Sequence, residues 1–281
     1  MNPLTILARR FVAGERPQDA VRVGERLNAK GIKATFDKLG EDVLDQAAAK
    51  RATEAAKDLL RLIPSGIERN ISIKMSSMGQ EISRGLCLEN VSGILDVAKE
   101  VDGFVRLDME GSKLTQDTLD VFHALRTRYD HVGIVLQASL HRTPDDVKEA
   151  VRRGDRVRLC KGAYKEPPHV ALQNMGKIRE AFKACAHELL DAGHNPAVAT
   201  HDEALIADTI SYAEARKIPA SRFEFQMLYG LRRRRWEELV EAGHHVRIYV
   251  PFGTHWIPYF YRRLRERREN VLFVLKGLLH G

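Results

Sequence analysis

The stretch "VGIVLQASLHRTPDDVKEAVRRGDRVRLCKGAY", residues 132–164, indicates the fold class. It begins with an apolar, β-prone run at 132–139 and ends with a second such run at 156–164. Between them, residues 143–154 carry apolar side chains at helical spacing behind a threonine, which is a favoured helix N-cap. A strand, a helix and a second strand in this order are the unit of a parallel sheet. The stretch therefore predicts an α/β protein.

The same alternation recurs along the rest of the chain. Helical candidates such as 42–63 and 202–218 separate further β-prone runs, so that eight such runs occur in all. No glycine-rich GxGxxG sequence follows the first run, which leaves a Rossmann domain without support. Eight alternations fit a closed (β/α)8 TIM-type barrel better than an open doubly wound sheet. The runs are Ile32–Gly40, Ile71–Ser77, Gly103–Glu110, Val132–Ser139, Arg156–Tyr164, Ala197–Asp202, Arg222–Leu228 and Val246–Gly253.

The chain is expected to form one barrel domain over residues 31–281, preceded by a short N-terminal helical segment at residues 1–30. Its 281 residues, of which 44% are hydrophobic, can bury one large core. No Pro-, Gly- or Ser-rich linker interrupts the alternation. A single catalytic domain with a helical extension is therefore the simplest organisation.

Composition and charge limit the cellular compartment and the classes of partner that we expect. The 45 Lys and Arg residues stand against 38 Asp and Glu residues, so the net charge of +7 gives little support for a nucleic-acid partner. Three cysteines without a CxxC pair argue against a disulfide framework and against a zinc site. We therefore predict a cytoplasmic protein without a bound metal.

The apolar segments are too short to span a membrane. No run approaches the roughly 20 apolar residues that a spanning helix needs, and the start of the chain lacks the apolar centre of a signal peptide. The last segment, "NVLFVLKGLLHG" at 270–281, is apolar but shorter than that. We expect it to pack as a helix on the body of the protein. The alternative is a peripheral contact with the inner face of the cell membrane.

Polar residues gather where the predicted strands end. In a (β/α)8 barrel these ends and the loops after them form one mouth, where active sites lie. Charged residues in strands that are buried on both faces need a partner or a ligand, because an unpaired buried charge costs several kcal/mol, roughly. The residues in question are Asp37, Glu41, Lys74, Asp108, Glu110, Gln137, Arg158, Lys161, Tyr164, Thr200, His201, Asp202, Gln226 and Tyr249.

Two arginine-rich stretches need separate interpretations. In "YFYRRLRERREN", residues 259–270, a helix beginning at Pro258 would put Tyr259, Arg262, Arg263 and Glu266 on one face. At the barrel mouth two such guanidinium groups could bind a carboxylate or a phosphate, the alternative being a solvated helix face. The run of four arginines at 232–235 lacks interleaved aromatic residues, so a solvated helix start is favoured over a nucleic-acid patch.

The stretch "RLCKGAYKEP", residues 158–167, leaves three chemistries open. Its arginine, lysine and tyrosine could hold a phosphate, support a Schiff-base lysine, or line a pocket for an aromatic or cyclic substrate. Residue types alone do not choose among these three interpretations.

The order of the motifs resembles the proline dehydrogenase family, the flavin-dependent barrel enzymes of proline catabolism. The chain resembles the monofunctional bacterial type, and the resemblance extends from "RFVAGE" to "ENVLFVLKGLL", which is nearly the whole chain. The motifs are "FDKLGE", "ISIKMSSMG", "VRLDMEGS", "RLCKGAYKEP", "ATHD", "EFQMLYGLR", "RIYVPFGTHW" and "YFYRRLRERRENV".

The resemblance implies oxidation of L-proline to Δ1-pyrroline-5-carboxylate, with hydride passing to noncovalent FAD and electrons then passing to a membrane quinone. It implies that Arg262 and Arg263 with Lys74 bind the substrate carboxylate, and that Asp108 organises the polar groups near the flavin. Glu41 would pair with an arginine and close the mouth. The implied walls of the substrate pocket are Tyr164, Leu228, Tyr249 and Tyr259. The implied FAD contacts are Gln137, Arg158, Lys161, Thr200, His201 and Glu266.

Two rival functions remain distinct from this one. The first is a Schiff-base lyase or aldolase on the same barrel, with Lys161 or Lys74 as the nucleophile and the arginines binding a phosphate. The second is a basic nucleic-acid-binding module that uses the arginines at 232–235 and 262–268. The first rival predicts borohydride trapping of the substrate, and the second predicts a strongly salt-dependent affinity.

Overall fold

Parallel strands form a closed barrel in the computed structural model, which describes residues 10–40, 43 and 45–256. Each strand pairs with the next, and the last pairs with the first. The predicted (β/α)8 fold class is therefore confirmed. The strands are β1 (Lys33–Lys38), β2 (Arg69–Lys74), β3 (Gly103–Asp108), β4 (Val132–Gln137), β5 (Arg156–Cys160), β6 (Ala197–Ala199), β7 (Glu224–Leu228) and β8 (His245–Phe252).

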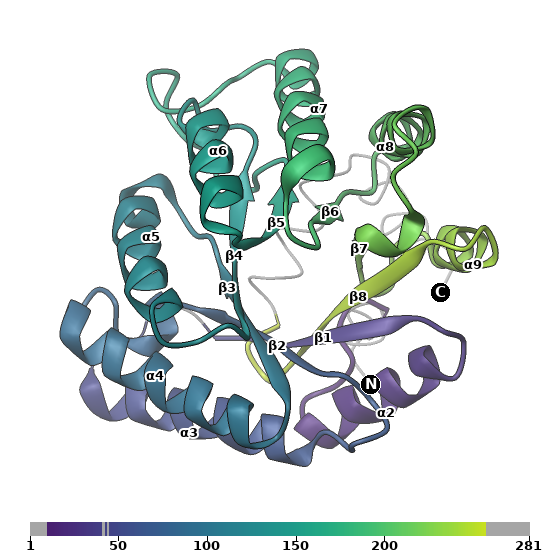
Figure 1. The fold of residues 1–281 in the computed structure, drawn as a ribbon. Helices are drawn as coiled ribbons and strands as arrows, with labels where there is room; N and C mark the ends of the chain where they lie inside the picture. Colours follow the sequence, from purple (N-terminus) through teal and green to yellow (C-terminus); the bar gives the residue numbers. More distant parts are fainter. Residues whose placement is uncertain (1–9, 41–42, 44, 257–281) are drawn as a thin grey trace, which may run out of the picture.

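Helices surround the outside of the strands (Figure 1). Within the part of the chain that the structure describes, seven follow β1 to β7 in turn, and α2 precedes β1 and packs against β1 and β8. The helices are α2 (Pro17–Asn28), α3 (Gln46–Leu62), α4 (Arg84–Glu100), α5 (Ser112–Arg126), α6 (Thr143–Arg153), α7 (Met175–Ala192), α8 (Glu203–Ala215) and α9 (Arg233–Glu241), with 3-10 turns η1 (Ser76–Met78) and η2 (Ala220–Arg222). The division into a helical segment at 1–30 and a barrel domain at 31–281 stays a prediction.

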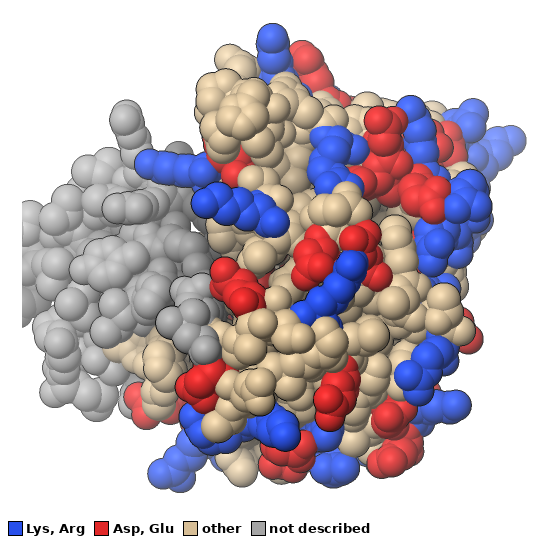
Figure 2. All heavy atoms as spheres, turned by 90° about the vertical axis from the view of Figure 1, so that its left-hand side faces the viewer, with Lys and Arg blue, Asp and Glu red and all other residues tan. Residues whose placement is uncertain are grey.

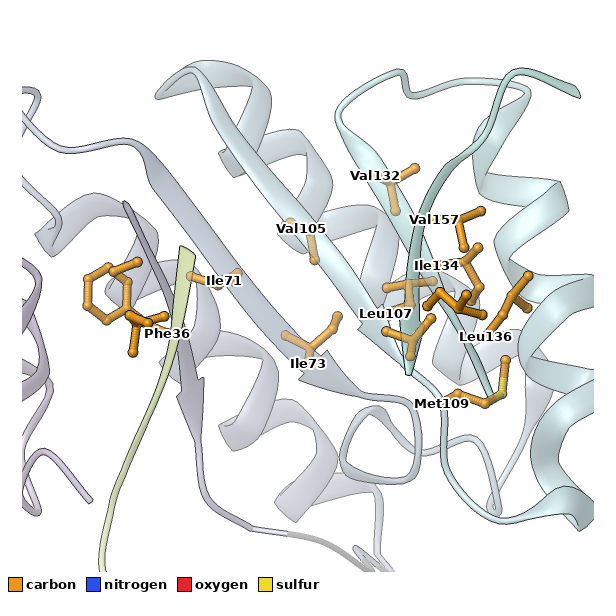
Figure 3. Packing of buried hydrophobic residues seen from close by; sticks show 14 of the residues in the cluster. Phe36, Ile71, Ile73, Val105, Leu107, Met109, Val132, Ile134, Leu136 and Val157 are labelled. Atoms are coloured by element: carbon orange, nitrogen blue, oxygen red, sulfur yellow. The ribbon is translucent and has the colours of Figure 1, made fainter. Parts of the chain in front are cut away.

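The hydrophobic core lies between the strands and this ring of helices. Alternate strand residues point outward into it, such as Ile71 and Ile73 on β2 and Val105 and Leu107 on β3 (Figure 3). Gly24 of α2 allows a close approach to β1, because a Cβ atom there would lie 2.5 Å from the ring of Phe36. Outward-facing residues therefore hold the barrel to its helices, and inward-facing residues are left for other roles.

The strands end earlier than the β-prone runs suggest. The run at 156–164 gives β5 only to Cys160, since Gly162 turns the chain with φ of +108°. The run at 197–202 gives β6 only to Ala199, because Asp202 accepts a hydrogen bond from the Ala204 amide and caps α8. Lys161, Tyr164, Thr200 and His201, predicted at the ends of these two runs, thus lie in the loops after β5 and β6.

Within residues 10–256, apart from 41, 42 and 44, no helix is long and apolar enough to cross a membrane. The same residues contain no cluster of three His, Cys, Asp or Glu side chains that could hold a metal ion. On the face drawn in Figure 2, Lys and Arg side chains are interspersed with Asp and Glu side chains, which is not the single-sign surface typical of nucleic-acid binding.

Candidate active site

Charged and polar side chains fill the barrel interior near its carboxyl end. The Nζ atom of Lys74 on β2 lies 2.9 and 3.0 Å from the two carboxylate oxygens of Asp37 on β1. Both residues are buried, with 8% and 1% of their surface exposed. Burial raises the pKa of Asp37, and the neighbouring Lys74 opposes that rise. The pair compensates two charges that would each be costly alone.

Asp108 at the end of β3 joins two other strands. One carboxylate oxygen accepts a hydrogen bond from Nη1 of Arg158 on β5 at 2.7 Å, and the other accepts one from the hydroxyl of Tyr249 on β8 at 2.7 Å. The guanidinium of Arg158 also lies 5.4 Å from the centre of the Tyr249 ring, within range of a cation–π contact. One carboxylate thus fixes both a cation and an aromatic wall.

Arg158 is fixed on its remaining sides as well. Its Nε donates to the side-chain oxygen of Gln226 on β7, and its Nη2 donates to the hydroxyl of Ser72 on β2 at 3.0 Å. With Asp108, three strands besides its own hold the guanidinium in one orientation. Such preorganisation is expected of a cation that must meet a ligand in a defined geometry.

Tyr249 is held in its protonated form. Burial and the neighbouring carboxylates of Asp108 and Asp37 raise the pKa of Tyr249 well above its ordinary value. The hydroxyl therefore remains a hydrogen-bond donor to Asp108 across the physiological range. A neutral ring with a fixed hydroxyl is suited to pack against an uncharged part of a substrate.

A second group of polar side chains gathers at the end of β4, around Gln137. The side chain of Gln137 donates to the backbone oxygen of Glu110 at 2.9 Å and accepts from the amide of Ala163 at 3.4 Å. The carboxylate of Glu110 in turn accepts hydrogen bonds from the backbone and hydroxyl of Ser76, at 3.0 and 2.7 Å. Gln137 is 3% exposed, so its amide is held at the floor of the mouth.

Lys161 lies in the loop after β5 and forms an ion pair with Asp202, with 3.1 Å between Nζ and Oδ2. Arg179 of α7 contacts the same oxygen through Nε at 2.7 Å. Burial favours a higher pKa for Asp202, but the two cations outweigh it and lower that pKa. The side chain of Lys161 remains 29% exposed.

The loop after β6 supplies two further predicted residues. The hydroxyl of Thr200 accepts a hydrogen bond from the amide of Asp202 at 3.1 Å, and Thr200 is buried. Nε2 of His201 lies 2.9 Å from the amide nitrogen of Leu228, so this ring nitrogen accepts and carries no proton. Leu228 itself is half-buried at the end of β7, and Tyr164 is 37% exposed.

The structure therefore brings ten of the predicted site residues to the carboxyl end of one barrel, and their roles toward ligands stay predictions. The five others lie outside the described residues: Glu41, Tyr259, Arg262, Arg263 and Glu266. Partners that were not assigned a role from the sequence are Asp37, Ser72, Ser76, Glu110 and Gln226. For Asp37, Ser72 and Gln226 the signal was present, since polar residues at alternate strand positions point into the barrel, whereas Ser76 and Glu110 lie in the turns after β2 and β3.

The lysines of the Schiff-base rival are both ion-paired. Lys74 contacts both oxygens of Asp37, and Lys161 contacts Asp202. A Schiff-base nucleophile needs an amine that is free to attack a carbonyl carbon, and each of these amines is held by a carboxylate. The geometry therefore disfavours that rival.

Comparison with known proteins gives a consistent result over most of the chain. Residues 20–276 match the proline dehydrogenase family. The chain is 40% identical over 273 residues to proline dehydrogenase 1 of Bacillus subtilis strain 168, a match that covers 97% of this chain and 90% of that protein. It is 39% identical over 284 residues to proline dehydrogenase of Deinococcus radiodurans, covering 98% and 91% of the two chains.

The fold is also similar to a solved structure. Proline utilization A from Bdellovibrio bacteriovorus, inactivated by N-propargylglycine, superposes with a TM-score of 0.84 at 28% identity. The match covers 92% of this chain and 32% of that longer protein. The chain thus corresponds to one barrel-sized part of it.

Proposed function

Because the chain belongs to the proline dehydrogenase family, and is therefore an oxidoreductase acting on the CH–NH group in proline catabolism, we propose the complete reaction as follows. L-proline is oxidised to Δ1-pyrroline-5-carboxylate on noncovalent FAD, and the electrons pass to a membrane quinone. The observation that carries the proposal is the carboxylate of Asp108, which joins the cation of Arg158 to the aromatic wall of Tyr249 at 2.7 Å each.

The substrate carboxylate would be bound by Arg262 and Arg263 together with Lys74. A pair of guanidinium groups can bind a carboxylate through several parallel hydrogen bonds. Asp37 keeps the Lys74 ammonium in place at 2.9 Å, so a cation is present at the carboxyl end of β2 before substrate arrives. Glu41 would pair with an arginine after binding and exclude water from the site.

The ring of proline needs apolar walls. Tyr249, Tyr164, Leu228 and Tyr259 would supply them, with Tyr249 oriented by its 2.7 Å hydrogen bond to Asp108. The bulk of Tyr249 favours proline over hydroxyproline, because a smaller residue there would leave room for the extra hydroxyl. No dedicated general base is required, since the free amine of proline can supply the electron push.

The donor set of the described residues fits FAD. Arg158 and Gln137 present fixed donors at neighbouring strand ends, and Lys161 presents an ammonium in the next loop. Arg158, Lys161, Gln137, Thr200, His201 and Glu266 would hold the dinucleotide, which supplies the two-electron acceptor when bound. A fixed cation near a flavin ring stabilises its reduced, anionic form and raises its redox potential.

We expect a cytoplasmic protein that contacts the inner face of the cell membrane peripherally, because its proposed acceptor is a membrane quinone. The acceptor proposal is tested by steady-state reduction of a soluble quinone analogue with L-proline as the donor. No reduction of the quinone by an enzyme that oxidises proline with other acceptors would contradict it.

The reaction itself is tested by product identity. Purified protein supplied with FAD, L-proline and an artificial electron acceptor should release a cyclic imine, which o-aminobenzaldehyde traps as a coloured adduct. Absence of the adduct, together with substrate trapping by borohydride, would contradict the proposal and favour the Schiff-base rival.

A further inference from the structure

The connection between β5 and α7, residues 161–174, is the most extended loop over the mouth within the part of the chain that the structure describes. Connections in barrels usually have about 2 to 6 residues, and longer ones are commonly functional. This loop begins with Lys161 and contains Tyr164, a proposed wall of the substrate pocket. It has no helix or strand of its own, so something else must hold it in place.

The far half of the loop is docked on the connection after β4. Leu140 and Ala171 form an antiparallel bridge, and both residues are 3% exposed. The amide of Leu172 donates to the oxygen of Ser139 at 2.8 Å, and the amide of His141 donates to the oxygen of Val170 at 3.0 Å. These contacts fix residues 170–172, and at the other end of the loop the Ser139 amide donates to the oxygen of Lys161 at 2.9 Å and Gln137 accepts from the Ala163 amide. Glu166 lies between these two anchored ends.

Glu166 provides a further anchor at the start of α5. Its carboxylate accepts a hydrogen bond from the Ser112 amide at 2.7 Å and a second one from the Ser112 hydroxyl. The N-cap residue of α5 is Gly111, which has no side chain to cap the helix. A carboxylate at this position satisfies an otherwise unpaired amide and interacts favourably with the helix dipole. Glu166 therefore caps α5 from a loop that is distant in sequence.

Gly111 places this cap next to the aromatic ring. A Cβ atom on Gly111 would lie 3.7 Å from Oε1 of Glu166 and 4.0 Å from Cδ1 of Tyr164. Both side chains thus lie against the same glycine, directly after the strand that ends in Asp108. Since Glu166 and Tyr164 are two residues apart, fixing the carboxylate also limits where the ring can lie.

We propose that Glu166 is a positioning residue for proline oxidation, which holds Tyr164 over the substrate pocket by capping α5 through Ser112. The inference rests on the function proposed above and deepens it. The carboxylate itself touches Ser112, and its effect on the substrate is exerted through the ring of Tyr164.

Steady-state kinetics with L-proline on the FAD-loaded protein test the inference. Glu166→Ala should raise KM for proline on the order of 10-fold, which is a loss of about 1.4 kcal/mol of binding from a displaced pocket wall, while kcat and flavin content change less than about 2-fold. Glu166→Gln should restore most of the affinity, since its amide can still accept from the Ser112 backbone. Glu180→Ala, an exposed glutamate on α7, is the matched control and should behave as the wild type.

A double variant separates positioning from a general structural role. If Glu166 acts through Tyr164, then Tyr164→Ala combined with Glu166→Ala should have the KM of Tyr164→Ala alone. Additive increases in KM, or a lowered melting temperature of Glu166→Ala with an unchanged KM, would overturn the positioning role. If Glu166→Ala does not fold, Ser112→Ala, which removes one of the two hydrogen bonds, should raise KM by a smaller factor, and an unchanged KM there would overturn it as well.

The wild type distinguishes this inference from the proposed function. A wild-type protein that does not turn over L-proline would overturn the proposed function and, with it, the role of Tyr164. A wild type with normal turnover and a Glu166→Ala variant with unchanged KM would overturn only the positioning role.

Discussion

The two ends of the barrel interior both contain buried charges, but the charges are arranged differently. At the amino end, Arg247 on β8 is 1% exposed and donates to Glu224 at 2.9 Å, to Glu68 at 2.8 Å and to the backbone oxygen of Ala34 at 2.9 Å. Glu224 is held by Arg247 and Gln226. Arg247 and Glu224 are therefore satisfied by contacts within the chain.

At the carboxyl end the charges are also paired, but partly exposed side chains belong to this end. Lys161 is 29% exposed along its side chain, and Tyr164 is 37% exposed overall. The loops that follow the strands begin here, as expected for the active face of a barrel. We propose that interior charge serves stability at the amino end and ligand recognition at the carboxyl end.

Arg247→Ala is the largest perturbation that would test the comparison. Removing one partner of a buried ion pair leaves Glu224 uncompensated, and this should cost about 3 to 5 kcal/mol of unfolding free energy. Urea denaturation followed by circular dichroism measures the loss. Arg216→Ala breaks an ion pair with Asp191 on the surface and should lower the unfolding free energy far less than Arg247→Ala. Equal losses of unfolding free energy in the two variants would show that the Arg247 network contributes no more to stability than a surface ion pair.

Acid titration tests the same end without truncating the network. Burial alone would raise the pKa of Glu224, but Arg247 and Gln226 bring it from 4.5 down to about 2. The resulting stability, roughly 3 kcal/mol, is present above pH 4.5 and is lost as the pH falls from 4.5 towards 2. The difference between the unfolding midpoints at pH 5 and pH 3 should therefore be smaller in Glu224→Gln than in the wild type. An identical pH dependence in both would show that Glu224 does not titrate in this range.

Arg263→Ala tests the carboxyl end. If this arginine clamps the substrate carboxylate, its loss should weaken proline binding by about 2 to 4 kcal/mol while flavin content and stability stay near wild type. Steady-state kinetics give the change in KM, and Arg267→Ala on the same predicted helix is the control. Proline kinetics that do not change in Arg263→Ala would rule out the clamp.

Tyr249→Phe should have the smallest effect of the four. It keeps the aromatic ring but removes the 2.7 Å hydrogen bond to Asp108. The loss of about 1 to 2 kcal/mol of transition-state stabilisation should lower kcat/KM for proline roughly 5- to 30-fold. Tyr229→Phe, in the loop after β7, should leave kcat/KM unchanged. An equal decrease of kcat/KM in both variants would show that the hydroxyl of Tyr249 has no specific role in catalysis.

The fold could be predicted because each β-prone run is followed by residues at helical spacing. The ends of β5 and β6 could not, since they depend on the turn at Gly162 and on the cap that Asp202 gives to α8. The alternation also indicated which polar side chains point inward. It did not indicate that Lys74 pairs with Asp37 rather than with Asp108, its neighbour in strand register, because that choice depends on how the strands close into a barrel.

We propose that the carboxyl end of the barrel binds a flavin and is the place where proline is oxidised. An absorbance spectrum of the protein with FAD, recorded without oxygen before and after addition of L-proline, tests it most directly. We predict an oxidised flavin band that bleaches on addition of L-proline. A protein that binds no FAD, or whose flavin band is unchanged by proline, would contradict it.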